Sequence, residues 1–156
     1  MDEITLAEVP ETRVLGSTEI GTYALIPVLL MKVYQYIGQN HVAITGPPVF
    51  VCHETSPEEV KLANESGNAV VEVAWPIMGE ASETKGIRLY TLPGGKMVRA
   101  VHHGPYEECE PAYMAVFTWI REHNLEICGW VREVYLNDPS TVKPEEILME
   151  ILVPVR

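Results

Sequence analysis

Apolar residues in this chain follow two periods that alternate along the sequence. Two stretches place apolar residues three or four positions apart, which is the spacing of one helix face. Short runs rich in Val, Ile, Leu and Tyr lie around them and are typical of strands. The pattern therefore predicts two helices set among several strands. The helical stripes are Ile26, Leu30, Val33 and Ile37, then Cys109, Tyr113, Val116 and Ile120.

The second half of the chain repeats the element order of the first. Apolar and turn residues coincide at a shift of 83 residues, and the closing strands coincide at a shift of 78. The change of shift predicts a connection five residues longer in the first half, around 54–68. Equivalent pairs at the shift of 83 are Gly21 and Gly104, Tyr23 and Tyr106, and Gly46 and Gly129.

Each half is predicted to be a β-α-β-β module, with repeat 1 at about 1–80 and repeat 2 at about 84–156. We expect an α+β fold in which the duplicated modules form one antiparallel sheet with two helices. The duplication also predicts pseudo-twofold symmetry and a central cleft, because clefts between modules are common ligand sites. Expected strands cover 4–14, 49–53 and 69–77 in the first half, and 87–101, 130–136 and 146–155 in the second.

The 156 residues are enough for one domain, and their formal net charge is -11. This charge argues against direct nucleic-acid binding and against anionic membrane surfaces, because both require clustered Lys and Arg. Three cysteines without CxxC spacing suggest reduced thiols. The first residues lack the basic region of a signal peptide, and the longest apolar stretch is too short to span a bilayer. We therefore expect a cytoplasmic protein.

Glu133 is the strongest candidate functional residue. It lies in a strand-like run in which Val131, Glu133 and Tyr135 share one face. A carboxylate on a buried face needs a cation, a proton or water, and Arg132 or Arg99 could serve as its partner. In the repeat, Glu133 corresponds to Phe50, so an equivalent position is acidic in one half and apolar in the other. This asymmetry favours a pocket carboxylate over a purely architectural residue.

Aromatic residues supply the other candidate ligand contacts. Tyr135 could line a planar ligand and donate a hydrogen bond to Glu133, or could belong to the core. Tyr23 and Tyr106 occupy equivalent positions, where they either cap their own cores or form the rim of the cleft. Glu150 is a possible second pocket carboxylate, with an internal hydrogen bond as the alternative. The remaining candidates, for which core packing is the alternative, are Phe50, Trp75, Phe117 and Trp119.

Other chemistry receives no support from the sequence. His102 and His103 are adjacent on a strand and face opposite sides, so they do not form a pair of metal ligands. Gly94 and Gly95 follow a proline in a turn and lack the Lys-Ser/Thr of a phosphate-binding loop. We predict no metal site and no cofactor.

Two motifs about 30 residues apart resemble those of a known family. The first is HxGPY at 102–106, and the second is ExYLxDP at 133–139. This combination is similar to the GyrI-like small-molecule-binding family, also called the bacterial transcription activator effector-binding domain. The resemblance implies a single such domain over 1–156. It also implies a pocket for hydrophobic, often cationic or planar compounds, in which Glu133 matches an acidic residue that faces the ligand's charge.

These observations lead to three hypotheses. The first is a stand-alone binding protein for a hydrophobic or cationic small molecule, with Glu133 as counter-ion. The second is a hydrolase of strained cyclopropane-type compounds that uses Glu133 and Tyr135. The third is a protein-interaction role like that of gyrase inhibitors, with an unknown partner. Family members are often fused to a DNA-binding helix-turn-helix, but the first strand here is expected from Ile4, so DNA binding would need a separate partner.

Overall fold

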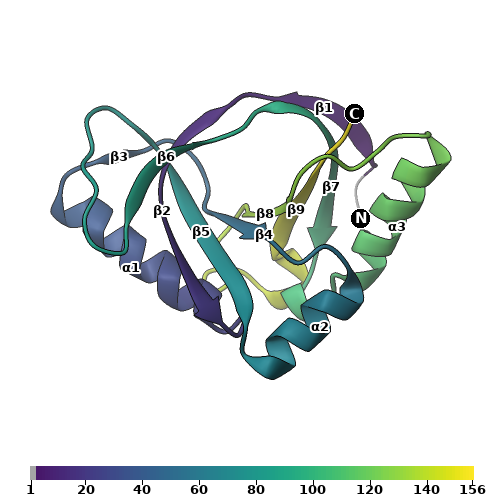
Figure 1. Cartoon of the computed structure of the whole chain (residues 1–156), viewed down its shortest axis with the longest axis horizontal. Helices are drawn as coiled ribbons and strands as arrows, with labels where there is room; N and C mark the ends of the chain where they lie inside the picture. The colour runs from purple at the N-terminus through teal and green to yellow at the C-terminus, as the bar shows by residue number, and fades with distance from the viewer. Residues whose placement is uncertain (1–2) are drawn as a thin grey trace. The chain divides into compact units, whose positions relative to one another are not determined.

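The computed structural model describes residues 3–156 (Figure 1). Its internal contacts divide the chain into two compact units. Unit 1 consists of Met1–Pro10 and Gly94–Arg156, and unit 2 consists of Glu11–Pro93. Each unit combines an antiparallel sheet with a long helix, so the predicted α+β class is confirmed.

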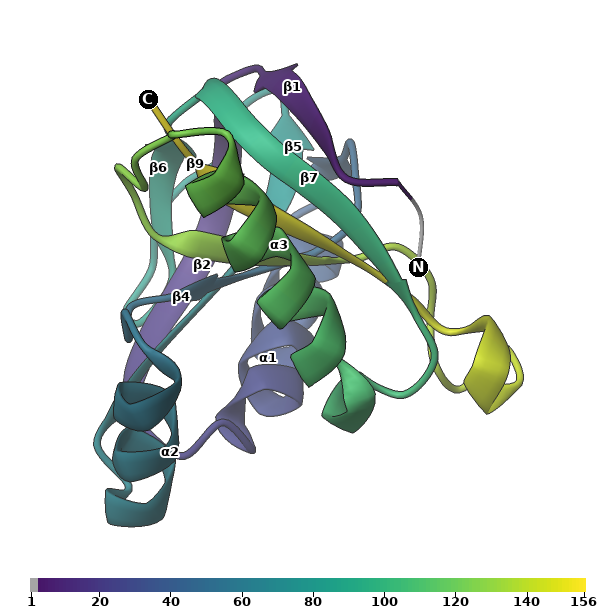
Figure 2. The same cartoon turned by 90° about the vertical axis from the view of Figure 1, so that its right-hand side faces the viewer.

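Unit 1 contains four strands in the order β1-β7-β9-β8, with every neighbouring pair antiparallel. Helix α3 (Glu110–Glu122) runs along β7 and β9 in Figure 2. One short 3-10 turn (Tyr106–Glu108) precedes α3, and another (Pro144–Glu146) precedes β9. The strands are β1 (Thr5–Val9), β7 (Gly95–His103), β8 (Val131–Tyr135) and β9 (Leu148–Pro154).

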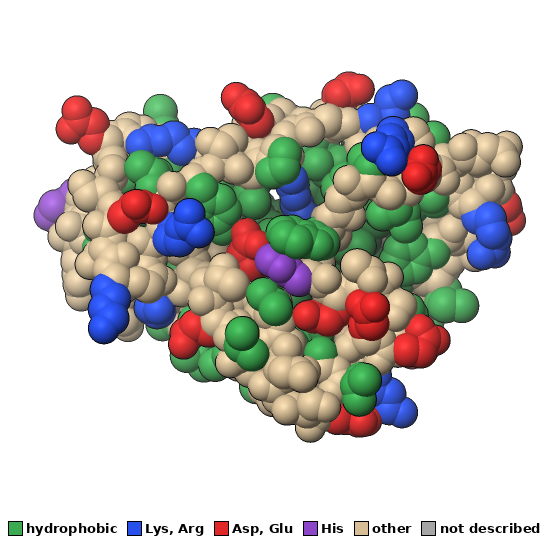
Figure 3. Space-filling model, viewed as in Figure 1, with side chains coloured by type: hydrophobic (Ala, Val, Ile, Leu, Met, Phe, Trp, Pro, Cys, Tyr) green, Lys and Arg blue, Asp and Glu red, His purple; other side chains and the backbone are tan. Residues whose placement is uncertain are grey.

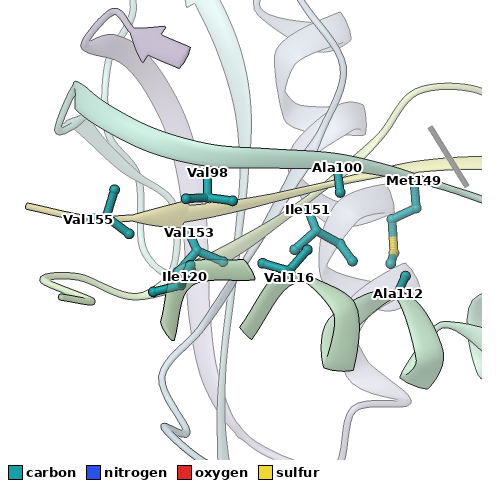
Figure 4. Packing of buried hydrophobic residues seen from close by; sticks show 9 residues of the cluster. All are labelled: Val98, Ala100, Ala112, Val116, Ile120, Met149, Ile151, Val153 and Val155. Carbon is teal, nitrogen blue, oxygen red and sulfur yellow. The ribbon is translucent and has the colours of Figure 1, made fainter. Parts of the chain in front are cut away.

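The core of unit 1 lies between α3 and the sheet. The buried face of α3 carries Ala112, Val116 and Ile120, at the helical spacing that the sequence predicts for one face. Strands β7 and β9 supply the facing apolar side chains (Figure 4). Removal of this apolar surface from water is the main favourable contribution to the folding of unit 1. The facing residues are Val98, Ala100, Met149, Ile151, Val153 and Val155.

Unit 2 contains four strands in the order β4-β5-β2-β6, and a short strand β3 also pairs with β5. Helix α1 (Leu25–Gln39) buries Leu29, Val33 and Ile37 and lies against β5 and β2. The strands are β2 (Thr12–Gly21), β3 (Ala43–Ile44), β4 (Val49–Cys52), β5 (Ala69–Met78) and β6 (Arg88–Leu92).

A third helix, α2 (Pro57–Ser66), occupies the connection that the sequence predicts to be longer in the first half. Ser56 caps its first turn by accepting a hydrogen bond from the Glu59 backbone N–H at 3.1 Å. Gly67 ends the helix in the left-handed conformation, with a φ of 67°. The sequence reading predicts two helices and misses this one, because none of its side chains is buried and it shows no apolar stripe.

The opening strand of each half pairs within the unit formed mainly by the other half. Strand β1 pairs with β7 in unit 1, although the rest of the first half is in unit 2. Strand β6, at the start of the second half, pairs with β2 in unit 2. The compact units therefore have different limits from the repeats at about 1–80 and 84–156, which describe sequence similarity.

Candidate functional site

Glu133 accepts hydrogen bonds from two tyrosine hydroxyls, one from α3 and one from its own strand β8. The Tyr113 hydroxyl, from α3, donates to Glu133 Oε2 at 2.5 Å. The Tyr135 hydroxyl, from β8, donates to Glu133 Oε1 at 2.9 Å, so the predicted hydrogen bond is present. Glu133 and Tyr135 share one face of β8, while Arg132 and Val134 are buried on the other. Both carboxylate oxygens thus accept from uncharged donors.

The HxGPY motif forms the turn that brings Tyr106 to this site. His102 Nε2 donates to the Pro105 carbonyl oxygen at 2.9 Å, closing the turn between β7 and α3. Gly104 has a φ of 115°, a conformation that favours glycine, and its N–H donates to the Ile147 carbonyl at 2.8 Å. The chain then enters the short turn that starts at Tyr106.

Aromatic rings surround the carboxylate. The Tyr106 ring packs on Tyr135 with centroids 5.1 Å apart and planes tilted by 53°. The Tyr113 ring lies 6.0 Å from Phe117, tilted by 34°. These distances and tilts fall in the range that favours aromatic pairs. We call Glu133, Tyr106, Tyr113 and Tyr135 the Glu133 site.

The protonation of the Glu133 site is shifted by burial. Burial raises the pKa of Glu133, opposed by the Tyr113 and Tyr135 hydrogen bonds and by the charge of His102. Burial, and then the charge of Glu133, raise the pKa of Tyr135 well above its ordinary value. The same two causes raise the pKa of the Cys109 thiol to about 11. Tyr135 and Cys109 are therefore protonated near neutral pH, whereas Glu133 gives up its proton less readily than an exposed glutamate.

Two other predicted site residues of unit 1 make separate contacts. Glu150 accepts a short hydrogen bond from Arg99 Nε and forms an ion pair with it, which matches the internal partner considered as its alternative. Arg99 therefore pairs with Glu150, although the sequence also allowed it as a partner for Glu133. The Trp119 ring stacks on His123 with centroids 3.7 Å apart, near the end of α3.

The remaining predicted site residues lie in unit 2. Tyr23 packs edge-on against Phe50 with centroids 5.9 Å apart, and its hydroxyl donates to Glu54 Oε1 at 2.6 Å. The Trp75 indole N–H donates to the Leu30 carbonyl of α1 at 3.0 Å. Phe50 is buried, with 3% of its surface exposed. Within unit 2 these aromatic residues make the core and capping contacts that the sequence allowed as alternatives.

Sequence reasoning did not include Tyr113 among the candidate site residues. It assigned Tyr113 to the core stripe of α3, and the side chain does pack against the core of unit 1 while staying partly exposed. A tyrosine at the edge of an apolar stripe places its ring against the core and its hydroxyl outside it. His102 and Cys109 were likewise left out of the candidate site, although His102 lowers the pKa of Glu133 and Cys109 raises the pKa of Tyr135.

Three further features concern metal ligands, membrane-spanning helices and surface charge. Among residues 3–156, no group of three or more His, Cys, Asp or Glu side chains is arranged to hold a metal ion. No helix over the same residues is long and apolar enough to cross a membrane. On the face drawn in Figure 3, acidic and basic side chains are interspersed with apolar ones, so that face has no continuous basic surface.

Comparisons with solved structures match the whole chain. The EcmrR C-terminal domain superposes with a TM-score of 0.80 and 21% identity, over 99% of this chain and 97% of that one. EcmrR in its complex with DNA gives 0.85 and 19% identity, and this chain spans 57% of that longer chain. A hydrolase from Listeria innocua gives 0.68 and 15% identity, over 99% of this chain and 92% of that one. These likenesses show the fold.

A further structural match is SAV2435 bound to tetraphenylphosphonium, with a TM-score of 0.61 and 14% identity, over 99% of this chain and 94% of that one. The comparison with curated proteins finds no match. The family model of the GyrI-like small molecule binding domain matches residues 2–156. This match covers the HxGPY turn, the Glu133 site and both compact units. The chain therefore belongs to the GyrI-like small-molecule-binding family.

Proposed function

We propose that this chain binds a hydrophobic organic cation beside Glu133. The observation that carries the proposal is the Glu133 carboxylate, whose two oxygens accept from the neutral hydroxyls of Tyr113 and Tyr135. Hydroxyl donors orient the carboxylate without neutralising its charge. A cation at this position would offset the burial that raises the pKa of Glu133.

The aromatic rings of the Glu133 site determine the chemical class of the ligand. Tyrosine faces attract cations through the ring quadrupole, by about 0.5–1 kcal/mol at exposed sites and more where water is excluded. The Tyr106 and Tyr135 rings also provide apolar surface for a ligand's own rings. The charge attraction must exceed the cost of desolvating both ions, which favours large, weakly hydrated cations. One charge and several rings recognise a class of compounds, so we expect broad specificity.

Tetraphenylphosphonium is a suitable probe for this proposal. It is a lipophilic cation with four aromatic rings, and SAV2435, a relative by fold, was solved bound to it. A fluorescent lipophilic cation would serve the same purpose in a titration.

We expect Glu133→Gln to weaken tetraphenylphosphonium binding at least fivefold, measured by isothermal titration calorimetry at neutral pH. The substitution removes the charge and keeps one amide oxygen, which accepts from one of the two tyrosine hydroxyls. Glu126→Gln is the matched control, because it makes the same change of net charge at an exposed glutamate and should leave affinity unchanged. Unchanged affinity in Glu133→Gln would remove Glu133 from the ligand site.

A hydrolase is a second candidate function, favoured by the raised pKa of Glu133 beside the Tyr135 hydroxyl. Such a carboxylate is suited to accept a proton from water near neutral pH. Water oxygen would bond to a carbon of a strained cyclopropane, a ring C–C bond would break, and the proton would pass to the released carbon. Mass spectrometry of a cyclopropane-bearing compound after incubation should then detect the water adduct. Stoichiometric binding without turnover would reject this candidate.

A further inference from the structure

A second carboxylate lies in an apolar strand of unit 2 and plays no part in the proposed function. Glu72 is in β5, and 8% of its surface is exposed. Its Oε1 accepts from His53 Nε2 at 2.6 Å, and its Oε2 accepts from the Tyr90 hydroxyl at 2.7 Å. The side chains of His53 and Glu72 are 18% and 10% exposed, so both keep some contact with solvent. We call Glu72, His53 and Tyr90 the Glu72 cluster.

Gly16 makes the Tyr90 contact possible. Tyr90 is in β6 and Glu72 is in β5, with β2 between these two strands. The Tyr90 hydroxyl passes over β2 at Gly16, where an added Cβ would lie 2.4 Å from that hydroxyl and 2.6 Å from the Val73 carbonyl oxygen. A side chain at position 16 would therefore displace Tyr90 from Glu72.

The repeat shows what is missing from the Glu72 cluster. Glu72 corresponds to Glu150 at the shift of 78, and Gly16 corresponds to Arg99 at the shift of 83. In unit 1, Arg99 forms an ion pair with Glu150. In unit 2 the position equivalent to that arginine is glycine, so the permanently charged guanidinium is replaced by a neutral phenol and an imidazole.

We propose that Glu72 is a second cation-binding carboxylate, and that His53 is its internal, displaceable occupant. The ligand class is a small amidinium or guanidinium compound, because a guanidinium is the group that meets the equivalent carboxylate in unit 1. Such a planar cation would donate to Glu72 Oε1 in place of His53, while Tyr90 keeps its hydrogen bond to Oε2.

The position of His53 makes it a suitable displaceable group. It directly follows the last residue of β4, so its side chain projects from beyond the end of the strand. An imidazole ring presents a single N–H to one carboxylate oxygen, whereas an amidinium presents two parallel N–H groups. Removal of the His53 side chain should therefore leave Glu72 Oε1 without this donor, while Oε2 keeps its hydrogen bond from the Tyr90 hydroxyl.

The test is benzamidinium binding, measured by calorimetry with the full chain carrying Glu133→Gln, which removes the other candidate carboxylate. Addition of His53→Ala should tighten binding at least fivefold. Further addition of Glu72→Gln should return the affinity to that of the Glu133→Gln parent. Benzamide, the neutral analogue of benzamidinium, should gain nothing from His53→Ala. Because Glu133 is already replaced in this background, a negative result would count against the Glu72 cluster and would leave the proposal for the Glu133 site unaffected.

Three results would overturn the proposal: no tightening in His53→Ala, tightening that survives Glu72→Gln, or equal tightening for benzamide. The second and third would indicate a nonspecific cavity. Thermal unfolding of each variant checks its folding. Where His53→Ala fails to fold, His53→Ser provides the comparison. Its side chain is too short to reach Glu72 Oε1, so benzamidinium should bind at least twofold more tightly than to the parent, and no gain would refute the proposal.

Discussion

Single residues determine the charge of the Glu133 site. The carboxylate is oriented by the hydroxyls of Tyr113 and Tyr135, and the raised pKa of Tyr135 keeps its hydroxyl a donor over the physiological pH range. A buried carboxylate with neutral donors costs stability when it ionises, because burial penalises the charged form. A residue that lowers stability in the unliganded protein is typical of a functional position.

The raised pKa of Glu133 predicts a pH-dependent effect on stability. Between the ordinary glutamate pKa of 4.5 and the higher folded value, the folded state binds more protons than the unfolded state. The contribution of Glu133 to stability is therefore complete below pH 4.5 and falls as pH rises through the folded pKa. Urea unfolding from pH 4 to pH 8 should show Glu133→Gln gaining stability relative to the natural protein as pH rises. A difference independent of pH would contradict the raised pKa.

Ligand binding should depend on the same ionisation of Glu133, but it should favour the ionised carboxylate, whereas folding favours the protonated one. A cation binds the ionised carboxylate, so the affinity for tetraphenylphosphonium should increase as pH rises through the Glu133 pKa and then level off. Calorimetry in two buffers of different ionisation enthalpy measures the protons released on binding. Glu133→Gln should lose this pH dependence, and retention of it would assign the titration to another group.

At the scale of elements, local signals and buried packing determine different helices. Helix α2 carries Ser56 at its start and Gly67 at its end, and Glu59 accepts hydrogen bonds from Thr55 N–H and Oγ, both at 2.9 Å. These capping signals were readable in the sequence, but a search for apolar stripes passes over them. Helices α1 and α3 were instead predicted from apolar residues at helical spacing, because each helix buries one face.

Val116 tests the role of packing in α3. It is fully buried between the helix and the sheet, so Val116→Ala should lower the free energy of unfolding by about 2 kcal/mol, from lost burial plus the remaining cavity. Met114→Ala on the exposed side of the same helix is the control, with an expected change below about 0.5 kcal/mol. Urea unfolding measures both. Equal losses in the two variants would mean that α3 does not pack on this face.

At the scale of the whole molecule, strand exchange links the two sequence repeats. Strand β1 pairs at the edge of the unit 1 sheet, and β6 pairs at the edge of the unit 2 sheet. The opening strand of each half therefore belongs to the unit that the other half mainly forms. Neither half alone contains all the strands of one unit. An unpaired sheet edge exposes backbone N–H and C=O groups, which favours association with a matching strand.

Strand exchange predicts that separated halves will associate. Fragments 1–83 and 84–156 should each be incompletely folded alone and form a 1:1 complex when mixed, because each supplies a strand that the other lacks. Circular dichroism and size-exclusion chromatography measure folding and stoichiometry. Fragment 11–83, which lacks β1, should bind 84–156 more weakly. Two fragments that fold separately and stay apart would contradict this prediction.

The sequence alone determined the α+β class, the duplication, the family and two of the three α-helices found among residues 3–156. These depend on local periodicity and motif spacing, which are properties of neighbouring residues. It also identified Glu133 and its hydrogen bond from Tyr135, because residues two apart in a strand share a face.

Only the tertiary structure decided which side chains meet across elements. Tyr113 reaches Glu133 from 20 residues away along the chain, and Tyr90 reaches Glu72 across an intervening strand at Gly16. The exchange of β1 and β6 likewise depends on pairing between distant segments. Such contacts follow from the packing of whole elements, and no spacing in the sequence encodes which distant hydroxyl or imidazole will face a given carboxylate.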